Sequence, residues 1–158
     1  MTDRPPKSVA LCDLPTFAGS SLGMSGYVHV TQDRINSFAE ATDDHQWIHV
    51  DPERAKDGPF GTTIAHGFLT LSLAPALFWQ LIDVTGTDQV INCGVGRAKF
   101  TLPVPVDSYV GLSADITSVE SCRGGYQVTA ALTFIVENAE RPACVAEMIV
   151  RYLGDVDA

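Results

Sequence analysis

The chain divides into a helix-like first half and a strand-like second half, and this division constrains its fold more than any other feature. From residue 88 onward, four long segments are rich in valine, isoleucine, threonine and aromatic residues, with breaks at residues 103–108, 123–125 and 138–142. Before residue 88, apolar residues recur mainly at helical spacing. Helices followed by antiparallel strands predict an α+β fold, with the helical segments packed on one face of an antiparallel sheet.

The length of 158 residues fits a single domain. Residues 1–24 are rich in proline, glycine and serine, so we expect a loosely ordered lead-in followed by a folded domain over residues 25–158. Residues 27–31 alternate in polarity and predict a short strand at the start of that domain.

Two helices are predicted between this strand and residue 60. The first spans residues 31–42, with Thr31 as its N-cap and an apolar face toward the core. The second begins with Asp51 as N-cap and Pro52 at its first helical position, and Gly58 closes it.

Residues 64–82 form the most apolar stretch of the chain. Its apolar side chains fall all round a helix, so we expect a helix that is buried on most faces, with Gly67 near its start and a kink at Pro75. The stretch also contains His66 and Ser72, and it reads as a buried helix rather than a membrane span. Such a helix, followed by four long strands, predicts a sheet curled around it.

The charge and the cysteines exclude several classes of protein. A net charge of −9, from 19 acidic against 10 basic residues, repels phosphate backbones and anionic membranes, so we expect no nucleic-acid or membrane partner. Cys12, Cys93, Cys122 and Cys144 form no CxxC pair and match no zinc signature, which predicts reduced, mostly buried thiols in a cytoplasmic protein. The first residues carry no secretory signal.

Residues 41–55, ATDDHQWIHVDPERA, gather carboxylates and imidazoles around one tryptophan and one isoleucine. Asp44 and His49 are five residues apart, a spacing that separates side chains on a helix, so they can cooperate only if a loop joins them and the next helix waits until Asp51. On such a loop, a carboxylate and an imidazole can hold a water and exchange its protons near neutral pH. These groups suit the addition of water to a polarised double bond, or its removal.

That chemistry also needs a group that stabilises negative charge on a carbonyl oxygen. Backbone N–H groups at a helix start can do so, and Gly67 would let a ligand approach the backbone closely. A structural interpretation stays open on the residues alone: Asp44 can shape a turn, and His49 can be a hydrogen-bonded core histidine.

Other candidate residues carry weaker patterns. His29, His45, His49 and His66 contain no pair at the spacing of a helical zinc motif, so we expect no metal site. Ser72 has no visible base and acid around it. Arg97 and Lys99 share one face of a predicted strand and could meet phosphates, although two solvated bases explain them as well.

The segment DDHQWIHVDPERA resembles the signature of the MaoC-like dehydratases, the (R)-specific enoyl-CoA hydratase family. That signature has an Asp, then x-Asn-Pro, an aliphatic residue, a His, and Ala or Ser after five more positions. The matching residues are Asp44, Ile48, His49 and Ala55, whereas Gln46 and Trp47 replace Asn-Pro and Asp43 replaces a Gly.

Two further segments are similar to the same family. AHGFL at residues 65–69 matches its His-Gly helix opening, and VPVDSYV at 104–110 resembles its Pro-Val-x-x-Gly-Asp/Ser strand turn. The resemblance extends over roughly residues 25–153. It implies a hotdog fold, in which an antiparallel sheet wraps around one long central helix, and a homodimer, often with the two sheets joined edge to edge.

The resemblance also implies an activity. Asp44 and His49 would activate a water, and the Gly67 backbone N–H would polarise the thioester carbonyl, so that trans-2-enoyl-CoA becomes (R)-3-hydroxyacyl-CoA. No metal or redox cofactor is implied, because the coenzyme A thioester itself supplies the electron sink. His66, Ser72 and Arg97 are further candidates for substrate contacts, Arg97 for a phosphate.

Two alternatives accompany this reading. A dehydratase that acts on acyl-carrier-protein substrates in fatty-acid elongation would carry the same residues, although the net charge favours coenzyme A over an acidic carrier protein. A non-catalytic hotdog subunit that binds acyl chains or supports a partner would need neither Asp44 nor His49.

Overall fold

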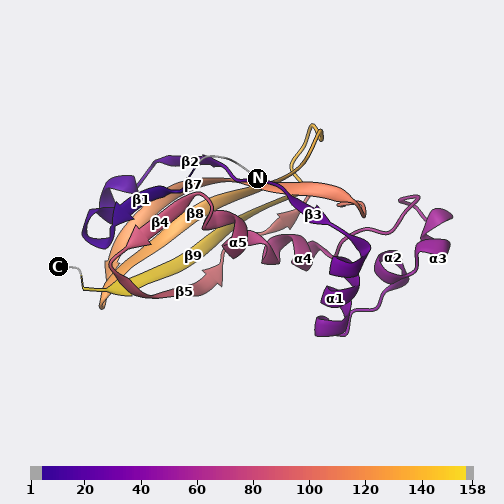
Figure 1. Cartoon of the computed structure of the whole chain (residues 1–158), viewed down its shortest axis with the longest axis horizontal. Helices are drawn as coiled ribbons and strands as arrows, with labels where there is room; N and C mark the ends of the chain where they lie inside the picture. Colours follow the sequence, from indigo (N-terminus) through magenta and orange to yellow (C-terminus); the bar gives the residue numbers. More distant parts are fainter. Residues whose placement is uncertain (1–4, 156–158) are drawn as a thin grey trace.

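The computed structural model describes residues 5–155, which form two sheets and a series of short helices (Figure 1). In chain order the elements are β1 (Lys7–Ala10), η1 (Leu11–Phe17), β2 (Ser21–Met24), β3 (Val28–Val30), α1 (Gln32–Thr42), α2 (Trp47–Val50), α3 (Pro52–Lys56), α4 (Gly67–Ser72), α5 (Ala74–Phe78), β4 (Ile82–Thr85), β5 (Thr87–Val95), β6 (Lys99–Phe100), β7 (Ser108–Cys122), β8 (Gly125–Val136) and β9 (Cys144–Gly154).

The larger sheet contains seven of the strands in residues 5–155 and is antiparallel throughout. Its order is β2–β7–β8–β9–β5, with β3 also paired to β7 and β6 also paired to β9. The break predicted at residues 123–125 is a tight hairpin that joins β7 to β8, with Cys122 opposite Gly125 and Gly124 in the left-handed region at φ +81°. The α+β prediction is therefore confirmed.

One face of this sheet carries the core. Every second side chain is buried over residues 110–116 of β7, 128–134 of β8 and 144–152 of β9, because successive strand residues point to opposite faces. In Figure 1, α4 and α5 lie along this sheet, whereas α1, α2 and α3 gather beyond one end of it. The fully buried members of the core include Leu14, Ile35, Leu77, Val110, Leu112 and Phe134.

The N-terminal segment is ordered, contrary to the prediction of a loosely ordered lead-in. Residues 7–24 form β1, η1 and β2, and the side chains of Leu11, Leu14 and Leu22 are at most 3% exposed in the core. The prolines and glycines that suggested disorder serve turns and a short helix instead, since Pro15 lies inside η1 and Gly19 has φ +75°. Residues 1–4 of the predicted lead-in and residues 156–158 of the predicted domain lie outside the described residues.

The predicted central helix is also corrected. Residues 64–82 contain two short helices, α4 and α5, that meet at Leu73, and Ile82 already belongs to β4, which pairs in parallel with β1. Pro75 is the reason for the break, because it lacks an N–H group and its ring crowds the carbonyl four residues earlier. Phe68 and Trp79 are 68% and 54% exposed, so the segment is not buried on most faces. Within residues 5–155, no helix has the length and apolar character to cross a membrane.

The helix caps follow the prediction. The Thr31 hydroxyl accepts a hydrogen bond from the Arg34 N–H at the start of α1, and the Asp51 carboxylate accepts one from the Arg54 N–H at the start of α3. Asp43 ends α1 in the left-handed conformation at φ 57°. These three positions fix where the segment between α1 and α3 begins and ends.

The cysteines differ from the expectation of mostly buried thiols. All four are free, but Cys12 and Cys93 are exposed, Cys122 is half-buried, and Cys144 alone of the four is buried. Burial raises the pKa of the Cys144 thiol to about 11.

Candidate active site

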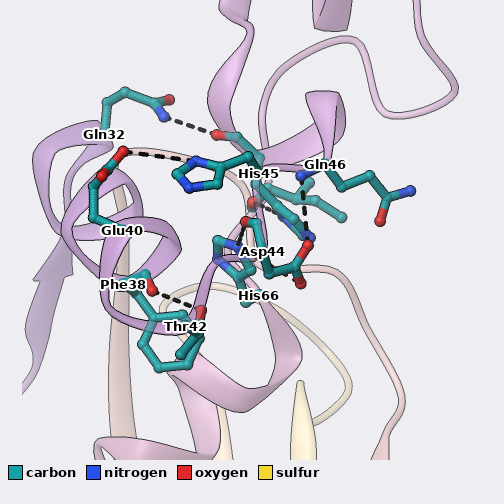
Figure 2. Close-up of polar contacts among 10 residues, drawn as sticks. Gln32, Phe38, Glu40, Thr42, Asp44, His45, Gln46 and His66 are labelled. Atoms are coloured by element: carbon teal, nitrogen blue, oxygen red, sulfur yellow. Dashed lines mark hydrogen bonds and ion pairs between the residues drawn. The ribbon is translucent and has the colours of Figure 1, made fainter.

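Asp44, His49 and His66 come together where the α1–α2 loop meets the start of α4. One carboxylate oxygen and one ring nitrogen from each histidine all lie within 4.8 Å of one another. Figure 2 shows Asp44 above His66, with His45 directed instead toward Glu40. The pairing of Asp44 with His49 that the sequence predicts is therefore present, and His66 joins it as a third member.

The segment from Asp44 to His49 is part loop and part helix. Asp44 lies in the loop that follows the left-handed Asp43, and its carboxylate faces the Gln46 N–H, with a nitrogen–oxygen distance of 3.4 Å. His49 lies in the single helical turn α2, so the prediction that no helix begins before Asp51 is wrong. The pair still meets, because Asp44 lies outside that helical turn.

Trp47 anchors this segment against α3. A Cβ atom added at Gly58 would lie 2.9 Å from the Trp47 ring, so the indole packs directly on the backbone there. The Arg54 guanidinium lies 4.4 Å from the centre of the same ring, a cation–π contact. These contacts hold the segment where the family signature has Asn-Pro.

Two hydrogen bonds orient His49, one at its ring and one at its backbone oxygen. Its side chain is buried, and Nδ1 lies 2.7 Å from the backbone oxygen of Ile64. A carbonyl can only accept, so Nδ1 carries the proton and Nε2 keeps a free lone pair. The Gln32 amide donates to the His49 backbone oxygen and accepts from the Thr63 hydroxyl, which ties α1 to the site.

The environment of His49 favours its neutral form. Burial lowers the pKa of His49 below its ordinary value of 6.5, and the nearby His66 adds to this, while the Ile64 carbonyl and the Asp44 carboxylate oppose it. A neutral imidazole with a free Nε2 is the form that can accept a proton from water.

A cavity of about 300 Å³ opens beside His49. Its walls include Gly67, Thr70, Phe100 and residues 101–104. Phe100 covers Gly67 so closely that a Cβ atom added to the glycine would lie 2.9 Å from the ring. Contact with Phe100 is therefore one reason for a glycine at this position. The glycine also lines the cavity, so its expected role in admitting a ligand stays a prediction.

Ser72 and Arg97 lie elsewhere. Ser72 lines a separate cavity of about 470 Å³ between the α4–α5 segment and strands β5 and β9. Arg97 lies between β5 and β6, in a concavity formed with β8 and β9, so it does not share a strand with Lys99 as predicted. Of the remaining histidines, His29 stacks on Tyr109 and faces Asp107 at 3.2 Å, away from the cluster.

The cluster has the residue types of a metal site but not the geometry. The His49 and His66 rings are stacked with centroids 3.8 Å apart and 25° between their planes. Ring lone pairs lie in the ring planes, so those of two stacked rings run side by side instead of converging on one ion. The arrangement suits proton transfer better than metal coordination.

Sequence reasoning missed Gln32, Thr63 and Phe100. None lies in a motif, and each reaches the site from a different segment of the chain. His66 was noted as a possible substrate contact and as part of the His-Gly helix opening, but not as a neighbour of Asp44 and His49.

Comparison with known proteins identifies the family. Residues 15–138 match the MaoC like domain. The chain belongs to this family. The 3-hydroxyacyl-thioester dehydratase Z of Mycobacterium tuberculosis is 50% identical over 146 residues, 92% of this chain and 97% of that protein. Nodulation protein N of Rhizobium leguminosarum is 41% identical over 89% of each chain.

A solved structure supports the fold assignment. The R-hydratase PhaJ1 from Pseudomonas aeruginosa superimposes with a TM-score of 0.71 at 20% identity, over 87% of this chain and 83% of that one. This likeness confirms the hotdog class for the MaoC-like chain.

Proposed function

We propose that this MaoC-like protein catalyses the reversible hydration of a trans-2-enoyl thioester to an (R)-3-hydroxyacyl thioester. The observation that carries the proposal is the proximity of the Asp44 carboxylate to a neutral His49, which itself lines a cavity together with Gly67. The 50% identity to a protein named as a 3-hydroxyacyl-thioester dehydratase supports the same reaction class.

The reaction adds the hydroxyl group of one water molecule to C3 and a proton to C2. Asp44 and His49 hold the water and draw off a proton, and its oxygen bonds to C3 of the enoyl group. Electrons of the double bond move toward the thioester carbonyl, whose oxygen gains negative charge. As the first residue of α4, Gly67 has an N–H with no acceptor inside the helix, and it can stabilise that oxygen. The pair of Asp44 and His49, which took up the proton of the water, returns one proton to C2, and this completes the addition.

Coenzyme A is the proposed carrier of the acyl group. A protein of net charge −9 makes a poor electrostatic match with an acidic carrier protein. The name of the mycobacterial relative specifies a thioester and no carrier, so a dehydratase of acyl-carrier-protein substrates is the second candidate. No metal or redox cofactor enters the proposal, since the thioester stabilises the charge that develops.

A homodimer joined through β5 is part of the proposal. This strand pairs with β9 on one side, and among the described strands nothing pairs with its other edge. Val90, Ile91 and Val95 on β5 are 40%, 43% and 53% exposed. An apolar edge strand is a template for pairing with a second chain.

Ultraviolet absorbance of an enoyl-CoA series tests the proposal. Purified protein should bleach the conjugated-thioester signal of at least one chain length, and the product should be the (R)-3-hydroxyacyl-CoA. The same acyl groups on carrier protein test the second candidate. Binding of enoyl-CoA with no loss of signal, and none with the carrier protein, would instead favour a non-catalytic acyl-binding subunit.

A further inference from the structure

His66 connects the two catalytic candidates to each other. Its side chain is 3% exposed, and its Nε2 lies 2.9 Å from the backbone oxygen of Asp44. Among the described residues, this is the one hydrogen bond that joins Asp44 to a distant segment of the chain, 22 residues away. The position of the carboxylate therefore depends on His66, because the Asp44 side chain itself is about half exposed and its other hydrogen bond is local.

The hydrogen bond also fixes the tautomer of His66. The Asp44 carbonyl can only accept, so the proton is on Nε2. Nδ1 is buried and has no hydrogen-bond partner among the described residues. The contact therefore fixes Nε2–H as the donor of His66 and leaves Nδ1 without a polar contact within residues 5–155.

The ring of His66 stacks on the ring of His49. The two imidazoles stack at 3.8 Å, and Phe38 lies on His66 at a centroid distance of 5.1 Å. The titratable groups that face His49 are Asp44 from the α1–α2 loop and His66 from the start of α4. His66 thus sets both the place of the carboxylate and the surface against which the imidazole of His49 rests.

We propose that His66 is a positioning residue, which holds the Asp44 main chain through Nε2–H and the His49 ring by stacking, and so sets the separation between carboxylate and imidazole across which the water is activated. This role replaces the substrate contact expected from the sequence. It rests on the proposed hydration and deepens it.

Two variants separate the two contacts of His66. His66→Phe keeps a ring against His49 and removes the donor to Asp44. His66→Gln keeps an amide N–H near the position of Nε2 and removes the ring. We expect His66→Phe to lower kcat by about tenfold or more with KM within about threefold, because small displacements of catalytic groups reduce rate more than binding. We expect His66→Gln to recover part of that loss in kcat, because it restores a donor to Asp44 but not the stacked ring.

The pH profile gives a readout that a purely structural role would not move. The face of a phenylalanine ring attracts a cation, so it should stabilise protonated His49 more than a neutral imidazole does. The acid limb of kcat/KM in His66→Phe should therefore move to higher pH than in the wild type. A His66→Phe variant with the kcat and pH profile of the wild type would overturn the proposal, as would a His66→Gln variant impaired as strongly as His66→Phe.

Nitrogen NMR of the wild type decides the question if the variants fail to fold. Long-range proton–nitrogen spectra at neutral pH should show a proton on Nε2 of His66, and a proton on Nδ1 alone of His49. A His66 ring that carries its proton on Nδ1 and none on Nε2 would contradict the proposal. If the wild type hydrates no enoyl thioester, the proposed function fails, whereas the tautomers still report on the contact between His66 and Asp44.

Discussion

Each of the two buried histidines in the cluster forms a hydrogen bond with a different backbone carbonyl, which determines the ring nitrogen that donates. The Ile64 oxygen binds Nδ1 of His49, and the Asp44 oxygen binds Nε2 of His66. The sequence predicted Asp44 and His49 as a pair from their residue types and motif. It could not predict these carbonyl contacts, because a backbone oxygen carries no residue identity and both contacts bridge segments at least 15 residues apart.

The lowered pKa of His49 predicts where activity is lost on acidification. As a base, His49 works only when neutral, and burial lowers its pKa below 6.5. We expect the acid limb of kcat/KM to lie below pH 6.5, and His45→Gln, a change at an exposed histidine, should leave it in place. The unfolded chain binds this proton more tightly than the folded one, so stability also falls as pH falls from 6.5 toward the folded pKa. An acid limb above pH 6.5 would contradict the assignment.

At the scale of elements, the sequence predicted the caps well and the short helices poorly. Thr31 and Asp51 mark helix starts because their oxygens satisfy nearby N–H groups, a purely local interaction. The sequence predicted a kink at Pro75, but not that residues 64–82 would divide into two short helices at Leu73. The helical turn α2 was not predicted either. Local sequence patterns therefore predicted where the site segment, residues 43–51 between α1 and α3, begins and ends, but not its internal conformation.

At the scale of elements, a Trp47 variant tests whether the packing of this indole positions the site segment. Trp47→Ala removes the indole from Gly58 and Arg54, so the segment that carries Asp44 and His49 should become less well positioned. We expect kcat to fall by roughly 10- to 100-fold. Circular dichroism should show a folded protein with a moderate loss of stability.

Trp79→Ala is the matched control. Trp79 is 54% exposed at the end of α5 and lies outside the site segment, so its loss should leave kcat within about threefold of the wild type. If Trp47→Ala retained full kcat, the segment would be held by other contacts and the role given to Trp47 would be wrong.

At the scale of the whole molecule, the division of the chain into helix-like and strand-like halves was enough to predict an α+β fold. The order of β7, β8 and β9 follows from hairpin connections between neighbours in sequence. The parallel pair β1–β4 could not be predicted, because its members are about 75 residues apart and β1 lies in a segment that resembles a flexible lead-in. The burial of Leu11, Leu14 and Leu22 orders that segment.

The assembly through β5 is a whole-molecule prediction. Light scattering should give twice the 16.9 kDa mass of the chain for the wild type. Ile91→Glu places a charge on the free apolar edge and should shift the protein toward the monomer. Tyr27→Glu, at a similarly exposed residue beside the opposite edge of the sheet, should remain dimeric. A dimeric Ile91→Glu variant would show that β5 is not the interface.

The rate of enoyl-CoA hydration by two single variants tests most directly the claim that Asp44 and His49 are the catalytic pair. Asp44→Asn and His49→Gln each remove a proton acceptor while preserving the size of the side chain. Loss of absorbance from the enoyl-CoA that the wild type hydrates best should be measured for both, alongside circular dichroism and light scattering. We expect each variant to fold and assemble as the wild type does, and to lose activity by a factor of at least about 100. Unchanged turnover in both folded variants would contradict the assignment of Asp44 and His49 as the catalytic pair.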